Sequence, residues 1–357
     1  MTHAEPSREG FDASAAAAPV PGRRQQAALA LSRSWLFAFL ILLVAFFWLT
    51  TPSATFLTHS NLTQIGLSTS EVVLLAIGET FVIVTAGIDL SIGGIVFFAG
   101  ICGGEVMLHL SGTSAQVIAG AYPHASRGIA FGVIVCILTG AVCGLVNGIA
   151  ITKLRLPPFI VTLGTLGVTF GLGEVIDGGS YLPAPIPPGL SQGFGAGKFL
   201  GLFYPIWVAL ALLLVAQVVF TYTRFGRYTC AVGSNAEGAR RAGIAVDLHI
   251  VKVYALAGLL AGVAAILDLA IYTNTTAVSH RGDNLNAISA VVLGGTSLFG
   301  GIGSILMSAV GAFVPTVLQN GLVIKNVQPF WQEVVVGATI IFAVYLDQLR
   351  RRRTESG

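Results

Sequence analysis

Carboxylates inside the apolar parts of the chain are the residues best suited to chemistry. Asp89, the aspartate of "TAGIDLSIGG", is one of them, and the others are Glu79, Glu105, Glu174, Asp268 and Glu333. A carboxylate costs about 2.5–3.5 kcal/mol at the centre of a membrane helix, so each needs a compensating role. Two interpretations stay open: either Glu79, Asp89 and Asp268 form a proton or sodium relay, or these carboxyl groups are protonated or paired and lock helices together.

Asp89 lies where we expect a helix to break. The apolar window from 71 to 108 is too long for one crossing of about 20 residues and too short for two comfortable ones. Backbone groups freed at a break need hydrogen-bond partners, which Asp89 and Ser91 can supply while Gly87 and Gly93 allow the turn. We therefore interpret Asp89 as the residue that holds a helix break beside a transport pathway, with direct substrate contact as the alternative.

A G-x-x-L-x-x-G pattern occurs once in each half of the chain, starting at Gly87 and at Gly295. Paired interruptions of this kind mark discontinuous helices near a transport pathway. A chain with 44 glycines also produces such repeated patterns by chance. Asn147 lies in another glycine-rich run, where its amide either bonds across a helix interface or faces a polar path. The predicted pathway and break residues are Gly87, Asp89, Ser91, Gly93, Asn147, Gly294, Gly295, Thr296 and Ser297.

Two further glycine series predict close helix packing. Gly140, Gly144 and Gly148 recur every four residues, and Gly258 and Gly262 do so later in the chain. Small residues at this spacing form one helix face and let two backbones approach each other in a membrane. We expect these glycines to have a structural role.

The composition is that of an integral membrane protein. Of the 357 residues 54% are hydrophobic and only 10% charged, and the mean hydropathy is +0.82, whereas an ordinary soluble domain carries roughly 25% charged residues. The formal net charge of +3 suggests no nucleic-acid partner. The four cysteines lie in apolar runs or in a basic loop, so neither a disulfide framework nor a metal site is expected.

The apolar windows predict about ten membrane spans of about 20 residues each. With that number most Lys and Arg residues gather on one side, so the positive-inside rule places both termini in the cytoplasm. We predict an all-α, polytopic transmembrane helix bundle with broken helices at residues 31–349. A disordered cytoplasmic tail, residues 1–30, precedes it, and a basic cytoplasmic tail, residues 350–357, follows it.

Two polar loops are long enough to meet partners. The cytoplasmic loop 221–252 contains "NAEGARRAGI", which predicts a short helix because Asn235 is a good N-cap, Glu237 suits the first turn and Gly243 can end it. This helix either fits a groove on a soluble partner or is a solvated connector. The proline-rich loop 177–198 on the outside is either a docking surface or a rigid connector.

Several motifs together resemble one known family. "EGARRAG" at 237–243 resembles the Glu-Ala-Ala-x-x-x-Gly signature of bacterial ATP-binding-cassette importer permeases, with Gly238 in place of the first alanine. "GIDLSIG", "NGIAITKLRLPPFIVTLGTLG" and "AISAVVLGGTSLFGGIGS" are similar, in order and spacing, to segments of the ribose-type monosaccharide permeases. The resemblance extends from the first span to Asp347.

The resemblance implies a subunit of a larger importer in the bacterial inner membrane. Its partners would be a second copy of the permease, surrounding lipid, cytoplasmic ATPase subunits that bind ATP and Mg, and a periplasmic sugar-binding protein. No catalytic residue is expected in this chain, because "QGFGAGKF" at 192–199 lacks the first glycine of a Walker A loop and its Ser or Thr. The implied coupling helix comprises Asn235, Glu237, Ala239 and Gly243, with Arg240 and Arg241 as flanking contacts to the ATPase.

The chain departs from this family at two places. Glu79 stands where the family often has an uncharged residue, and Asn284 to Asn286 stand where it commonly has Glu-Leu-Asp. The identity of the sugar is therefore open. The alternative functions are an ion-coupled secondary transporter that uses Glu79, Asp89 and Asp268, and a receptor or scaffold without transport.

Overall fold

The computed structural model describes residues 23–179 and 182–328, together with 330–332, 334–339, 341–342 and 345. Glu333 and the predicted C-terminal tail lie outside the described residues, as do residues 1–22 of the predicted N-terminal tail. The first helix begins at Arg23, earlier than the predicted boundary after residue 30. The glutamines and alanines that follow Arg24 are good helix formers, which accounts for the earlier start.

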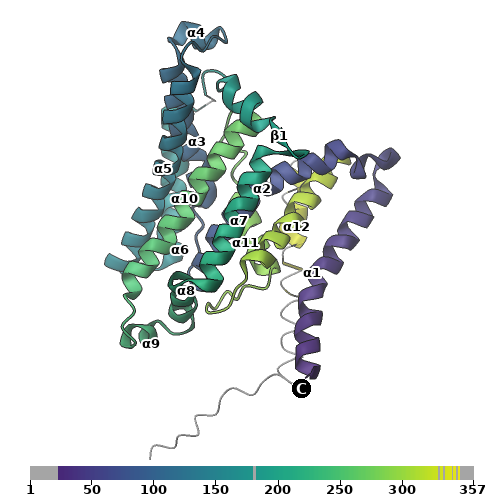
Figure 1. Ribbon diagram of the computed structural model, residues 1–357, viewed down its shortest axis with the longest axis vertical. Coiled ribbons are helices and arrows are strands. Elements are labelled where there is room, and N and C mark those ends of the chain that lie inside the picture. Colours follow the sequence, from purple (N-terminus) through teal and green to yellow (C-terminus); the bar gives the residue numbers. More distant parts are fainter. Residues whose placement is uncertain are drawn as a thin grey trace, which may run out of the picture.

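Helices make up nearly all of the regular structure in the described residues (Figure 1). The elements are α1 (Arg23–Thr50), η1 (Pro52–Leu57), α2 (His59–Val84), α3 (Ile92–Ser111), α4 (Ser114–Ile118), α5 (Ala125–Lys153), α6 (Pro158–Asp177), η2 (Gly189–Gly195), β1 (Lys198–Phe199), β2 (Leu202–Phe203), α7 (Tyr204–Tyr222), α8 (Arg224–Ser234), α9 (Ala236–Arg241), α10 (Val246–Tyr272), α11 (Asp283–Leu293) and α12 (Ile305–Ile324). The prediction of an all-α bundle is confirmed, with the antiparallel β1–β2 pair as a small exception.

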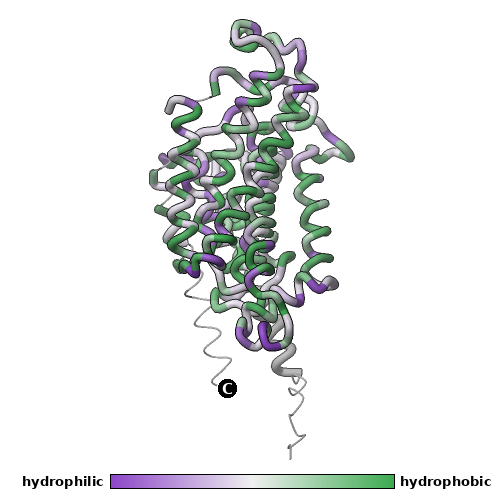
Figure 2. The backbone as a smooth tube through the Cα atoms, turned by 90° about the vertical axis from the view of Figure 1, so that its left-hand side faces the viewer, coloured by the Kyte–Doolittle hydropathy of each residue, from purple (hydrophilic) through white to green (hydrophobic). Residues whose placement is uncertain are grey.

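The bundle has the features of a multi-pass membrane protein. Within the described ranges seven helices are long and apolar enough to cross a membrane, and the apolar part of α1, Trp35–Thr50, is shorter. Hydrophobic residues prevail along the helices, whereas hydrophilic residues gather toward their two ends (Figure 2). With 11 residues, α11 extends about 16 Å, roughly half of the hydrocarbon core. Ten spans and cytoplasmic termini remain predictions.

The core of the bundle forms where α10 packs against α5, α2 and α3. The interface between α5 and α10 is made through the predicted glycines: a side chain at Gly144 would clash with the carbonyl oxygen of Tyr254, and one at Gly140 with that of Gly258. The two backbones therefore touch, which confirms the prediction of close packing. The apolar outer sides of α5, α6 and α7 are largely exposed, as expected for helices that face lipid.

Two interruptions divide the inner helices. Residues Thr85 to Ser91 connect α2 to α3, and residues Gly294 to Ser304 connect α11 to α12. The first lies inside the apolar window 71–108, which the sequence predicts to hold more than one helix, and the second contains the G-x-x-L-x-x-G pattern that starts at Gly295. The first brings irregular backbone into the interior, whereas the tip of the second is exposed at Phe299 and Ile302. The candidate site is described from these two connections.

Candidate functional site

The first interruption is held by Asp89. Its Oδ1 accepts hydrogen bonds from the Ser91 N–H at 2.8 Å and from the Ser91 hydroxyl at 2.5 Å. Ala86 has φ 63°, in the left-handed region that a non-glycine residue adopts only under constraint. Both Asp89 and Ser91 are fully buried, so the carboxylate satisfies backbone that water does not reach.

A chain of side chains links this interruption to two other helices. The Asn147 amide of α5 donates to the Ser91 hydroxyl at 2.8 Å, and its Oδ1 accepts from the Thr165 hydroxyl of α6 at 2.5 Å. Asn147 is fully buried. Its amide therefore bonds across a helix interface in this structure, and the chain Asp89–Ser91–Asn147–Thr165 ties the start of α3 to α5 and α6.

Buried polar atoms beside the interruption are not paired in this way. Asp89 Oδ2, both carboxyl oxygens of Glu79 and the Tyr254 hydroxyl accept or donate no hydrogen bond among the described residues. Tyr254 interacts electrostatically with both carboxyl groups, and a side chain at Gly87 would meet its hydroxyl. Glu79 and Asp89 thus form one polar group with Tyr254 in the interior.

The second interruption turns through residues that the sequence singles out. Gly295 adopts φ 82°, which favours glycine. The Ser297 N–H donates to the Ile302 carbonyl at 2.9 Å, and the buried Thr296 hydroxyl accepts from the Ser304 N–H at 3.4 Å. Gly294 packs against the backbone of α12. The segment is an ordered turn between two helices.

The two interruptions meet each other and α8. The Gly301 N–H of the second donates to the Val84 carbonyl, the last residue of α2, at 2.8 Å. Gly233 of α8 packs so closely on this pair that a side chain there would clash with Val84 and Gly301. Segments far apart in the sequence therefore share one contact, and α8 joins it to the next helix, α9.

The short helix α9 projects from the end of the bundle (Figure 1). Its predicted cap is confirmed, because Asn235 Oδ1 accepts from the Gly238 N–H at 2.8 Å. Ala239 is buried against Val232 and Val246, whereas Glu237, Arg240 and Arg241 are exposed. Gly243, with φ 85°, follows the helix. The arrangement presents a charged helix face on an apolar base; its role in coupling stays a prediction.

The exposed charges of α9 form ion pairs within the helix and with Asp247 in the first turn of α10. Arg240 lies 3.5 Å from Glu237 and 3.0 Å from Asp247, and Arg241 lies 3.2 Å from Glu237. Exposed pairs of this kind contribute about 0–1 kcal/mol each to stability. They can therefore exchange partners at little cost.

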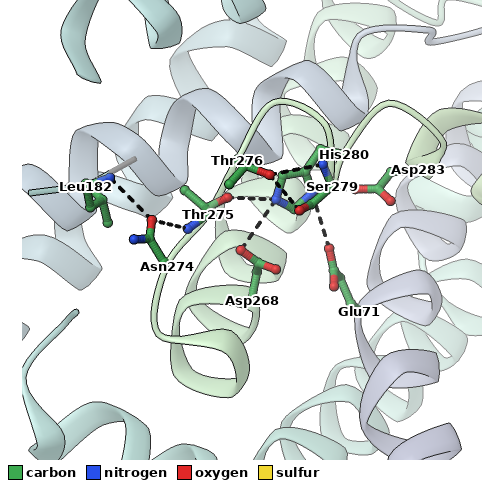
Figure 3. Close-up of polar contacts among 9 residues, drawn as sticks. All are labelled: Glu71, Leu182, Asp268, Asn274, Thr275, Thr276, Ser279, His280 and Asp283. Atoms are coloured by element: carbon green, nitrogen blue, oxygen red, sulfur yellow. Dashed lines mark hydrogen bonds and ion pairs between the residues drawn. The ribbon is translucent and has the colours of Figure 1, made fainter. Parts of the chain in front are cut away.

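A polar cavity of about 220 Å³ lies between α2, α10, α11 and α12. Around it His280 meets three carboxylates (Figure 3): its Nδ1 lies 2.6 Å from Asp283 and 3.7 Å from Glu71, and its Nε2 lies 3.4 Å from Asp268. His280 Nε2 is also 2.8 Å from the Thr275 hydroxyl. The cluster joins α2, α10, α11 and the connection between the last two.

Sequence reasoning missed most of this cavity. Only Asp268 is among the carboxylates singled out above, and it contacts His280, whereas Glu79 and Asp89 lie beside Tyr254. Glu71 could have been found by the criterion that singled out Glu79, because it too is a carboxylate inside an apolar helix. His280 and Asp283 stand in a polar connection, "SHRGDN", that gives no indication of burial. Asn286 lines the cavity, and Asn284 donates to the Leu90 carbonyl at 3.3 Å.

Replacing Asp89 by alanine is expected to destabilise the protein by about 1–3 kcal/mol, because the buried Ser91 N–H loses its acceptor. Asp89→Asn keeps an oxygen acceptor and is expected to remain close to wild type in thermal unfolding measured in detergent. Asp177→Ala is a matched control, since Asp177 Oδ1 accepts from the Gly179 N–H at 2.8 Å with the same spacing at an exposed position. Equal losses of stability in the two alanine variants would contradict the structural role of Asp89.

Comparison with known proteins relates the whole chain to transport proteins. Residues 61–344 match the family described as branched-chain amino acid transport system / permease component. The ribose import permease protein of Escherichia coli strain K12 is 34% identical over 93% of this chain and 98% of its own. The D-allose transport system permease protein of that strain is 34% identical over 88% of this chain and 90% of its own. Its galactose/methyl galactoside import permease protein is 32% identical over 88% of this chain and 94% of its own. No solved structure matches the chain.

Proposed function

The chain belongs to the family of branched-chain amino acid transport system permease components and is a sugar permease of the ATP-binding-cassette type; from this premise we propose that it imports a monosaccharide. It would do so as the membrane-spanning subunit of an importer in the bacterial inner membrane. The observation that carries the proposal is the similarity, along nearly the whole chain, to permeases named for ribose, allose and galactose. Because these sugars differ, the proposal names the class of substrate.

The energy would come from partner subunits. Cytoplasmic ATPases would bind ATP and Mg²⁺ and contact α9, whose exposed Glu237, Arg240 and Arg241 suit a charged groove. The link from α9 through α8 to the contact between Val84 and Gly301 supports a mechanical route. When the ATPases close, movement of α9 would shift both helix interruptions together. The permease would thereby change between its inward-facing and outward-facing states.

The remaining partners would lie in and outside the membrane. A second copy of the permease would complete the pathway, with lipid around the pair. A periplasmic sugar-binding protein would deliver the sugar to the end of the bundle opposite to α9. The proline-rich loop 177–198 supports this docking, because its described part is braced by a hydrogen bond from Tyr122 to the Pro185 carbonyl at 2.5 Å.

Uptake by proteoliposomes tests the proposal. Vesicles that contain the permease, its cognate ATPase and its binding protein are expected to accumulate at least one of D-ribose, D-allose and D-galactose only when ATP is enclosed with the ATPase. The permease alone, given a proton or sodium gradient, is expected to accumulate none of them. Gradient-driven uptake by the permease alone would instead establish the ion-coupled alternative, for which Glu79, Asp89 and Asp268 are the candidate carriers because each has a buried carboxyl oxygen without a hydrogen bond from the described residues.

A further inference from the structure

We propose that the cavity between α2, α10, α11 and α12 binds one neutral monosaccharide through its hydroxyl groups. This inference rests on the proposed function and adds a position inside the permease where the sugar is held. The cavity holds about 220 Å³, many times the roughly 10–15 Å³ of cavity space that one water needs. A small polyhydroxylated molecule therefore fits where a single ion would leave most of the space to water.

The lining matches the hydrogen-bonding needs of a sugar. Each sugar hydroxyl both donates and accepts, as do the side-chain amides of Asn274, Asn286 and Gln319, whereas the carboxylates of Glu71 and Asp268 only accept. Val72 is the one aliphatic side chain among the described lining residues. Removing water from such a polar surface costs free energy unless the ligand replaces its hydrogen bonds, which an apolar ligand does not do.

One acceptor in the cavity has no hydrogen-bond partner. Asp268 Oδ2 is buried and receives no hydrogen bond from the described residues, although it forms an ion pair with His280 at 3.4 Å. The contact with His280 offsets part of the charge of this carboxylate, but no hydrogen bond to Oδ2 is formed. A sugar hydroxyl that donates to Asp268 would satisfy this oxygen, which gives the site a reason to bind a donor-rich ligand.

The engaged nitrogens of His280 favour a neutral ligand over a metal ion. Glu71, His280 and Asp283 do offer ligand atoms within 4.8 Å of one another. Both nitrogens of His280 are already engaged, however: Nδ1 with Asp283 at 2.6 Å and Nε2 with Thr275 at 2.8 Å (Figure 3). A metal ion needs a free imidazole lone pair and would have to displace these contacts, whereas a sugar leaves them in place.

Two lining residues relate the cavity to the first helix interruption. A side chain at Gly93, near the start of α3, would clash with the His280 carbonyl oxygen, and Asn284, next to Asp283, donates to the Leu90 carbonyl of the interruption. His280 and Asp283 both line the cavity. A sugar bound there would therefore contact residues that adjoin the interruption.

Protection of an introduced thiol tests the inference. Ser68 lines the cavity and Ser60 lies exposed on the same helix, outside it. In the full-length permease, D-ribose, D-allose or D-galactose is expected to slow labelling of Ser68→Cys by a water-soluble methanethiosulfonate several-fold. Labelling of Ser60→Cys is expected to stay unchanged, as is that of Ser68→Cys in sucrose, which is too large for the cavity. The four native cysteines are corrected for with wild type labelled in parallel.

Two results of the labelling experiment would overturn the inference. Absence of protection by all three sugars, in a permease whose complex imports one of them, would reject the cavity site and leave the proposed function standing. Protection by Zn²⁺ or Mn²⁺ without protection by any sugar would identify a cation site instead.

If Ser68→Cys fails to fold, a second pair of variants tests the site. Gln319→Ala is expected to lower the maximal rate of uptake several-fold. Asn320→Ala is expected to leave it unchanged, because Asn320 lies next to Gln319 but pairs with Asn61 outside the cavity. Equal rates in both variants would reject the site.

Discussion

Replacing Glu237 and Arg240 together by alanine is expected to lower ATP-driven sugar uptake by roughly 5- to 150-fold, the range that coupling free energies of about 1–3 kcal/mol give. Both side chains are more than half exposed, and their ion pairs lie on the surface of α9. Loss of these pairs therefore costs little folding stability, while a charged contact with the ATPase disappears. The measurement is uptake and ATP hydrolysis by the same proteoliposomes.

Lys153→Ala is the control for this double variant. Lys153 is an exposed cation in the last turn of α5 and lies outside α9. Its loss changes the surface charge without touching the proposed coupling contact, so uptake is expected to stay close to wild type. If the double variant takes up sugar normally and keeps sugar-dependent ATP hydrolysis, α9 is not the coupling helix.

Gly144→Val is expected to prevent the permease from accumulating as a folded protein. The valine would clash with the Tyr254 carbonyl in the contact between α5 and α10, where the obstacle is backbone that cannot rotate away. The cost should therefore exceed the roughly 1–3 kcal/mol of ordinary overpacking. The yield of monodisperse protein after extraction in mild detergent measures the effect.

Gly164→Val separates this clash from the general effect of placing valine in a helix. Gly164 lies within α6, and a side chain there would meet nothing within 4 Å. The two substitutions change helix propensity alike, so only the contact differs. A yield at Gly164→Val as low as at Gly144→Val would show that the α5–α10 contact is not responsible.

Local patterns in the sequence predict much of the fold because they depend on near neighbours. The apolar windows locate the long helices, and the excess length of the 71–108 window indicates the interruption that the structure has between Val84 and Ile92. The Asn235 cap and the four-residue spacing of Gly140 and Gly144, which creates a small-residue face on one helix, are likewise properties of residues within a few turns of one another. These features need no knowledge of which helix lies beside which.

The cavity around His280 depends on distant parts of the chain. Glu71 and Asp283 are far apart in sequence, and only the packing of α2 against α10 and α11 brings their carboxylates to the same imidazole. The same is true of the hydrogen bond from Gly301 to Val84, which joins the two interruptions. No periodicity in the sequence specifies such contacts.

The sequence by itself determined the class of the protein, its helices, its interruptions and the capped short helix α9, because hydropathy and backbone conformation act over short stretches of chain. Tertiary structure decided what Asp268 does, and it alone linked Asp89, which the sequence already indicates as the residue that holds the first interruption, to α5 and α6. Asp89 accepts hydrogen bonds from its own turn, linked to Asn147 and Thr165, whereas Asp268 belongs with His280 in a separate cavity. The two carboxylates look alike in the sequence, and they differ because the environment of a buried charge is set by the helices packed around it.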